Sequence, residues 1–202
     1  MKYFSILTYI SENYIELLGT ILSLIYLYLS IKENISLWIF GFLCSALYTI
    51  VFFQNKFYAD LSLQLYYLGV SIFGWISWKK KSNNNQQDNN LHITSLSKKQ
   101  ILQYIPVTLL IYVVYFLILK YKTDSPIPIM DSVVGALSVV ATWMLAKKKI
   151  ENWLLWIVAD AIATGLFIYK HLYPTSALYI IYTIMAVIGY FQWKKSEKKL
   201  SP

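Results

Sequence analysis

Trp153-Leu-Leu-Trp-Ile-Val-Ala-Asp160 places two tryptophans and a carboxylate inside an otherwise apolar stretch of the chain. On a helix, Trp153, Trp156 and Asp160 fall on one stripe, because residues three and four apart share a face. If this helix enters a membrane near Glu151, a rise of about 1.5 Å per residue brings Asp160 close to the middle of the hydrocarbon core.

A carboxylate at that depth should face a cavity or a partner, because its burial in lipid is costly. Aromatic rings beside a buried anion suit an organic cation, so the stretch predicts a cation-binding site. The alternative is that the tryptophans are interfacial anchors and that Asp160 pairs with a donor on another helix.

Composition indicates an integral membrane protein. Of the 202 residues, 57% are hydrophobic and only 14% are charged, whereas soluble domains carry about 25% charged residues. The net charge of +8 involves lysines and no arginine, which argues against a nucleic-acid partner. The single Cys44 excludes an internal disulfide and a cysteine metal site. The two histidines, His92 and His171, fall in expected loops, so no metal centre is predicted.

Seven apolar stretches predict an all-α protein with seven transmembrane helices, since each approaches the length of about 17 to 25 residues that a span needs. A short extracytoplasmic segment, 1–13, precedes them, and Asp131 is expected to cap the fifth. The polar stretch 79–100 is expected to be a flexible cytoplasmic linker and 194–202 a basic tail. The predicted spans are 14–31, 36–53, 58–78, 101–119, 129–146, 152–169 and 173–193.

The lysines predict the orientation of the chain in the membrane. Thirteen of them lie on the face that carries the linker and the C-terminus, and five lie on the opposite face. The positive-inside rule therefore predicts an N-terminus outside the cell and a C-terminus in the cytoplasm.

An internal repeat relates 37–80 to 152–195 without a gap, at an offset of 115 residues. With one more residue of offset, Gly19 aligns with Gly135. We therefore predict two three-helix units, 14–78 and 129–193, connected by the helix 101–119. That extra crossing makes the units parallel, an arrangement known in transporters that bind substrate near the midplane. The identities include Trp38/Trp153, Thr49/Thr164, Tyr67/Tyr182, Gly74/Gly189 and Trp78/Trp193.

Several segments resemble the PnuC family of vitamin transporters. The most specific is 150–160, followed by 165–170 and 172–179, and the resemblance extends over 14–195. It implies a 3+1+3 helix fold like that of the SWEET sugar transporters. It also implies facilitated diffusion of nicotinamide riboside across the bacterial inner membrane, with trapping by a cytoplasmic kinase. Further matching residues are Glu16, Gly19, Leu47, Tyr48, Phe57–Asp60, Gln64, Gly74, Trp75 and Trp78.

One position departs from the family pattern. Thr142 stands where a glutamine is expected in nicotinamide riboside carriers, and its hydroxyl is shorter than an amide that both donates and accepts. The family also includes a thiamine-carrying branch, so thiamine is the alternative substrate. Both vitamins carry an aromatic cation, which the Asp160 stretch suits equally.

The candidate substrate-binding residues combine this stretch with polar and aromatic positions on other spans. For Gln64 the alternative is a hydrogen bond between helices, and for Trp75 it is anchoring at the interface. The full set is Trp153, Trp156, Asp160, Gln64, Thr142, Tyr48, Trp75 and Tyr182.

Other functional classes find less support. No His-Glu-x-x-His, Gly-x-Ser-x-Gly or phosphate-binding-loop motif is present, so neither an intramembrane enzyme, an ATP site nor a cofactor is expected. A scaffold or receptor without transport activity is the alternative from another class. The sequence leaves the oligomeric state open, a homo-oligomer included.

Overall fold

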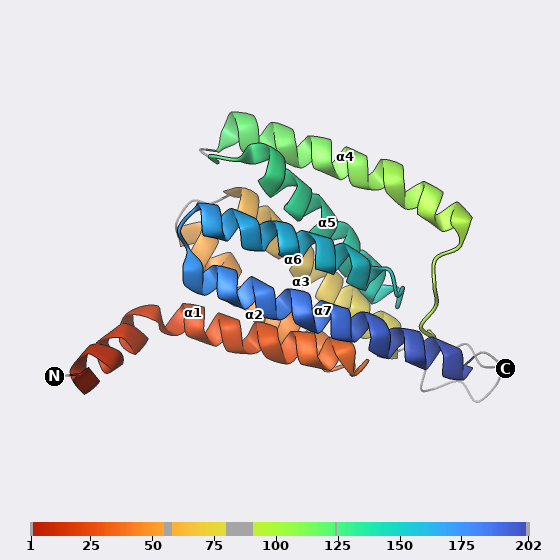
Figure 1. The fold of residues 1–202 in the computed structure, drawn as a ribbon, viewed down its shortest axis with the longest axis horizontal. Coiled ribbons are helices and arrows are strands. Elements are labelled where there is room, and N and C mark those ends of the chain that lie inside the picture. The colour runs from red at the N-terminus through yellow and green to blue at the C-terminus, as the bar shows by residue number, and fades with distance from the viewer. Residues whose placement is uncertain (1, 55–57, 80–90, 124, 201–202) are drawn as a thin grey trace.

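Helices are the only extended regular elements in the described part of the chain, in agreement with the all-α prediction from the sequence. The computed structural model describes residues 2–54, 58–79, 91–123 and 125–200, and within these it describes side chains from Tyr14 on, apart from 15, 16, 58–60 and 200. Figure 1 shows successive helices running in opposite directions. The helices are α1 (Lys2–Ile31), α2 (Leu37–Gln54), α3 (Tyr58–Lys79), α4 (Lys98–Lys122), α5 (Pro128–Ala146), α6 (Asn152–Tyr169) and α7 (Tyr173–Leu200).

Length and hydropathy make five of these helices, α2, α4, α5, α6 and α7, suitable for crossing a membrane. In the described part of α1 the apolar stretch is shorter, Leu17–Ile31. Helix α4 has no buried residue, and its surface is dominated by exposed apolar side chains such as Leu102 and Leu110. Lipid accounts for such a surface, because a helix satisfies its own backbone hydrogen bonds and can expose apolar groups to hydrocarbon.

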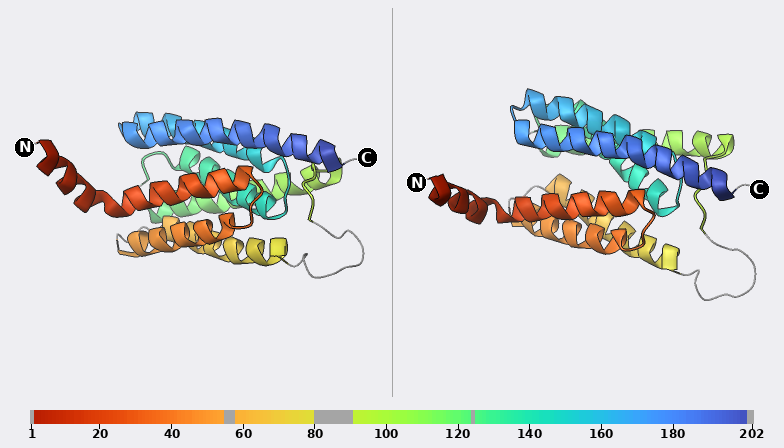
Figure 2. Two further views of the ribbon diagram at one scale, coloured as in Figure 1. Left: turned by 90° about the horizontal axis from the view of Figure 1, so that it is seen from below. Right: turned by 60° about the horizontal axis from the view of Figure 1, so that its bottom comes forward.

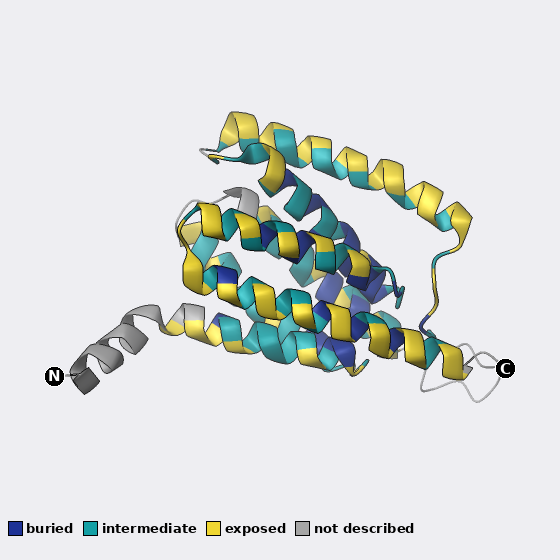
Figure 3. Cartoon of the chain, viewed as in Figure 1, coloured by how far each residue is buried: buried dark blue, intermediate teal, exposed yellow. Residues whose placement is uncertain are grey.

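Six helices close a ring, and the seventh lies outside it. The principal contacts join α1 to α2, α2 to α3, α3 to α5, α5 to α6, α6 to α7 and α7 back to α1. Helix α4 packs on α5 at the periphery of the molecule (Figures 1 and 2). Helix α5 consequently contains more buried residues than the other helices, as the dark blue segments in Figure 3 indicate.

The internal repeat reappears as equivalent packing. In one unit the Trp38 indole lies against Gly74 and meets Trp78 edge to face, with ring centroids 5.5 Å apart. In the other unit Trp153 lies against Gly189 and meets Trp193 at 5.6 Å in the same geometry. Glycine is required at both contacts, since a Cβ on Gly189 would lie 2.7 Å from the Trp153 ring.

Most of the buried apolar side chains gather at the end of the molecule where α1, α3, α5 and α7 finish, which we call the lysine-rich end. Two hydrogen bonds there cross between the units. Trp78 Nε1 donates to the Ala146 carbonyl at 3.1 Å, and Trp193 Nε1 donates to the Ser30 carbonyl at 3.0 Å. The two donors, Trp78 and Trp193, are related by the repeat offset of 115 residues, and the two acceptors, Ser30 and Ala146, are related by an offset of 116. Each unit therefore bonds to the other in the same way.

The boundaries of three segments differ from the sequence expectation. Helix α1 starts at Lys2, so the segment 1–13 is largely helical, and α7 continues through the basic tail as far as Leu200. Of the linker 79–100, residues 80–90 lie outside the described part, while Lys79 ends α3 and 98–100 begin α4. The side chains of Glu16 and Asp60 also lie outside it.

The linker residues 91–97, expected to be flexible, form an ordered strap across the lysine-rich end. Ile93 is 2% exposed within the core, and the Thr94 backbone bonds to Lys148 and Ile150. Glu197 accepts from the Ser95 N–H at 2.6 Å, and Glu151 accepts from that of Leu96 at 2.8 Å. A polar composition did not prevent order here, because one apolar side chain and two carboxylates hold the backbone.

Helix ends follow from local chemistry, with one correction. Ser97 and Gln100 form a reciprocal capping box at the start of α4, and Pro128 occupies the first turn of α5. Asp131, expected to cap α5, lies one turn inside it, where its carboxylate accepts from the Ser125 hydroxyl and pairs with Lys170 at 3.1 Å. A carboxylate one turn in still complements the positive end of the helix.

Candidate functional site

Asp160 is a buried carboxylate on α6, with 6% of the residue exposed. The small neighbours Ala159 and Ala163 are also buried and allow close helix packing around it. Thr164 donates to the Asp160 backbone carbonyl at 2.8 Å, so this hydroxyl does not serve the carboxylate. Among the described residues, no hydrogen bond or ion pair reaches the Asp160 carboxylate. An unpaired acid within an apolar helix bundle is a candidate functional group.

Tyr182 of α7 lies within electrostatic range of Asp160, and also of Tyr48 and Cys44 on α2. Its hydroxyl shares a hydrogen bond with Ser23 of α1. Because the Ser23 hydroxyl donates to its own helix, to the Thr20 carbonyl at 2.8 Å, Tyr182 must be the donor to Ser23. The Tyr182 oxygen thus remains an acceptor, and its bond to Ser23 joins α7 of the second unit to α1 of the first.

Aromatic rings continue the site on the inner side of the ring of helices. Tyr179 meets Tyr182 at a centroid distance of 5.3 Å and Phe167 at 4.9 Å. Tyr67 on α3 lies close to Ser138 on α5 and within electrostatic range of Tyr179. The helices α3, α5, α6 and α7 therefore contribute to one aromatic, hydroxyl-bearing interior.

Tyr67, Tyr179 and Ser138 were not among the residues predicted from the sequence. The repeat could have identified Tyr67, because it is the counterpart of Tyr182 at the offset of 115 residues. Tyr67 also lies three residues after Gln64 on the same face of α3. Tyr179 ends the segment 172–179 that carries the family resemblance, whereas nothing in the sequence singles out Ser138.

Three of the predicted residues lie on helices of the first unit: Tyr48 on α2, and Gln64 and Trp75 on α3. Gln64 is half-buried, and within the described residues its amide makes no hydrogen bond. Tyr48 stacks on Phe52 with centroids 5.8 Å apart, and its hydroxyl lies against Gly19 of α1. Trp75 is half-buried against the core of the lysine-rich end. Of these three residues, Tyr48 lies within electrostatic range of the Tyr182 hydroxyl.

The remaining predicted residues take part in helix packing. Trp153 is 1% exposed between α6 and α7, and its indole nitrogen is buried with no hydrogen-bond partner in the described part of the chain. Trp156 is partly buried against the same core. Thr142 is 5% exposed and donates to the Ser138 carbonyl at 2.8 Å. The structure thus places Asp160 and Tyr48 each within electrostatic range of Tyr182, and it buries Trp153 in the core of the lysine-rich end.

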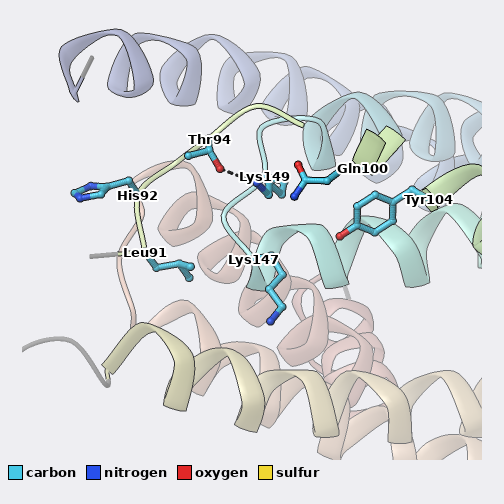
Figure 4. A pocket seen from close by; sticks show the side chains of 7 residues that line it. All are labelled: Leu91, His92, Thr94, Gln100, Tyr104, Lys147 and Lys149. Atoms are coloured by element: carbon cyan, nitrogen blue, oxygen red, sulfur yellow. Dashed lines mark hydrogen bonds between the residues drawn. The ribbon is translucent and has the colours of Figure 1, made fainter. Parts of the chain in front are cut away.

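A separate pocket of about 470 Å³ opens at the lysine-rich end (Figure 4). None of the eight predicted substrate residues lines it. Its walls come from the strap, the start of α4 and the connection between α5 and α6. The lining residues are Leu91, His92, Thr94, Gln100, Tyr104, Lys147 and Lys149. The described residues contain no group of three or more His, Cys, Asp or Glu side chains that could hold a metal ion.

Comparisons with known proteins identify relatives over nearly the whole chain. The family model for the nicotinamide mononucleotide transporter matches residues 13–195. The nicotinamide riboside transporter PnuC of Escherichia coli K12 is 29% identical, over 93% of this chain and 87% of that protein. PnuC of Neisseria mucosa is 26% identical, over 84% of this chain and 68% of that protein.

Among solved structures, the crystal structure of the vitamin B3 transporter PnuC matches with a TM-score of 0.77. The match has 23% sequence identity and covers 98% of this chain and 87% of that one. At this identity the structural match establishes a shared fold.

Proposed function

The chain belongs to the nicotinamide mononucleotide transporter family of multi-pass membrane proteins, and from this premise we propose that it takes up nicotinamide riboside across the bacterial inner membrane. The function is transport and not catalysis. The curated relatives that carry the name nicotinamide riboside transporter support this substrate. The observation that carries the proposal within this chain is the buried Asp160 carboxylate, which has no partner among the described residues and lies within electrostatic range of the Tyr182 hydroxyl.

The chemistry of nicotinamide riboside suits this arrangement. Its pyridinium ring is a flat cation, which a buried carboxylate and aromatic faces attract in a low-dielectric interior. Its ribose hydroxyls and carboxamide need hydrogen-bond donors and acceptors; the Gln64 amide can supply both, and the Tyr182 oxygen can accept. Trp153, Trp156, Thr142 and Trp75 complete the proposed lining as the helices move during transport.

We further propose a 3+1+3 arrangement of parallel repeats, similar to that of SWEET transporters. The equivalent tryptophan–glycine packing in the two units and the peripheral position of α4 support it. The lysine distribution supports an N-terminus outside and a C-terminus in the cytoplasm. In this orientation the lysine-rich end faces the cytoplasm.

The proposed mechanism is uniport by alternating access. The bonds from Trp78 to Ala146 and from Trp193 to Ser30 join the units at the lysine-rich end, so substrate release to the cytoplasm requires both to break. Rocking of two parallel units about the site would expose it to each side in turn. Phosphorylation by a cytoplasmic kinase would then trap the riboside and keep its inward gradient.

Titration of the detergent-purified protein with nicotinamide riboside and with thiamine tests the substrate, with intrinsic tryptophan fluorescence as the signal. Saturable quenching by the riboside alone is the expected result. Quenching by thiamine alone would overturn the substrate assignment and place the chain with the thiamine carriers, as Thr142 allows. A Thr142→Gln variant should bind the riboside more tightly if this position reads the carboxamide.

A further inference from the structure

The pocket at the lysine-rich end lies apart from the Asp160 site and is positively charged. Figure 4 shows Lys149 turned toward Thr94 of the strap and Lys147 directed the other way from the same connection, with Gln100 and Tyr104 of α4 also lining the pocket. None of the seven lining residues is acidic.

Neither lysine of the pocket has a carboxylate partner among the described residues. The Lys149 ammonium donates to the neutral Thr94 hydroxyl at 2.8 Å. The Lys147 ammonium lies over two aromatic rings, 4.7 Å from the centroid of Phe73 and 5.2 Å from that of Trp143. Glu197 accepts from the Ser95 N–H and hydroxyl, and one oxygen of Glu151 accepts from the Leu96 N–H. The pocket therefore retains two positive charges that an anion could neutralise.

Polar donors on α4 add to these charges. The Gln100 side-chain oxygen accepts from the Ser97 N–H at 3.0 Å. The NH₂ of the same amide can therefore donate to a ligand. Tyr104 contributes a phenolic hydroxyl to the lining, which can donate as well as accept. The first turn of α4 contributes the positive end of its dipole on the same side.

We propose that this pocket binds a phosphate group, carried either by an anionic lipid or by a soluble phosphate ester. Lysines bind phosphate as point charges, and the amide and hydroxyl donors can bond to the remaining oxygens. The volume of about 470 Å³ falls within the range typical of small-molecule sites, about 300 to 1,000 Å³. The pocket also lies at the ends of apolar helices, where basic groups meet lipid headgroups. The site is independent of the substrate that the transporter carries.

Binding at this position would act on the strap. Thr94 connects the strap to the α5–α6 connection through backbone bonds to Lys148 and Ile150 and through the Lys149 side chain. A phosphate bound by Lys149 and Gln100 would join α4 to this connection directly, and Lys147 would add a second positive charge to the pocket. We therefore expect the ligand to raise the unfolding temperature of the full-length protein, because it binds only the folded chain.

The test is thermal unfolding of the full-length protein in nanodiscs of phosphatidylcholine, titrated with inorganic phosphate against chloride at constant ionic strength. We expect a saturable rise in unfolding temperature for the wild type. The double variant Lys147→Gln/Lys149→Gln should weaken the apparent affinity by about tenfold or more. The matched control Lys194→Gln/Lys195→Gln removes the same charge from α7, outside the pocket, and should titrate like the wild type.

Nanodiscs that contain one quarter phosphatidylglycerol distinguish the two sources of phosphate. If a lipid fills the pocket, these discs stabilise the wild type but not the pocket variant, and they abolish the response to inorganic phosphate. If a soluble ester is the ligand, the response to phosphate is the same in both lipids. The proposal is overturned if neither phosphate nor phosphatidylglycerol stabilises the wild type, or if both double variants lose the response equally. Lys149→Gln alone provides a milder variant should the double substitution impair folding.

Discussion

At the scale of single residues, Asp160 is the central group of the proposed substrate site. Its carboxylate is buried on α6 without a partner among the described residues. The carboxylate of Asp131, in the first turn of α5, is instead paired with Lys170. An unpaired buried charge costs free energy unless a ligand compensates it. The two acids therefore predict opposite behaviour when each is neutralised.

We expect Asp160→Asn to lower the affinity for nicotinamide riboside by about tenfold or more, which equals about 1.4 kcal/mol. The fold should remain intact, because the carboxylate makes no internal hydrogen bond. Asp131→Asn is the matched control, and it should lower thermal stability and leave affinity unchanged. Equal affinities for Asp160→Asn and the wild type, measured by fluorescence titration, would remove Asp160 from the site.

At the scale of helices, the repeat makes packing contacts predictable in pairs. Gly189→Ala would bring a methyl group to 2.7 Å from the Trp153 ring and should cost about 1 to 3 kcal/mol of stability. Gly165→Ala, on α6, meets nothing within 4 Å and should be neutral or stabilising by up to about 1 kcal/mol. Thermal unfolding of both variants decides the point, and equal unfolding temperatures would contradict the close contact.

The bounds of the helices could be predicted from the sequence, but which helices pack against one another could be predicted only in part. Apolar runs set the bounds of α2 and α6 to within a residue, because lipid thickness fixes the length of a span. The repeat anticipated that Trp38 and Trp153 would occupy equivalent places. It could not anticipate that Trp153 packs on Gly189 near the lysine-rich end, since position along a stripe does not reveal which helix lies opposite. The strap at 91–97 was missed because composition does not register bonds to distant acids such as Glu197.

At the scale of the whole molecule, two hydrogen bonds connect the units and should oppose opening at the lysine-rich end. Trp193→Phe removes one of them and should cost about 0.5 to 1.5 kcal/mol beyond the effect of lost ring volume. Trp38→Phe serves as the control, because the Trp38 indole is equally buried but its N–H has no partner in the described chain. Trp78→Phe should behave like Trp193→Phe, and a larger effect of Trp38→Phe on unfolding would argue against these bonds.

Counterflow of radiolabelled nicotinamide riboside in proteoliposomes tests directly whether this protein is a uniporter for the riboside. We predict that unlabelled riboside inside the vesicles drives uptake of label from outside, and that a protonophore leaves the rate unchanged. Uptake should fall in Asp160→Asn and persist in Asp131→Asn. Absence of counterflow, or uptake that requires a proton gradient, would contradict a uniporter for this substrate.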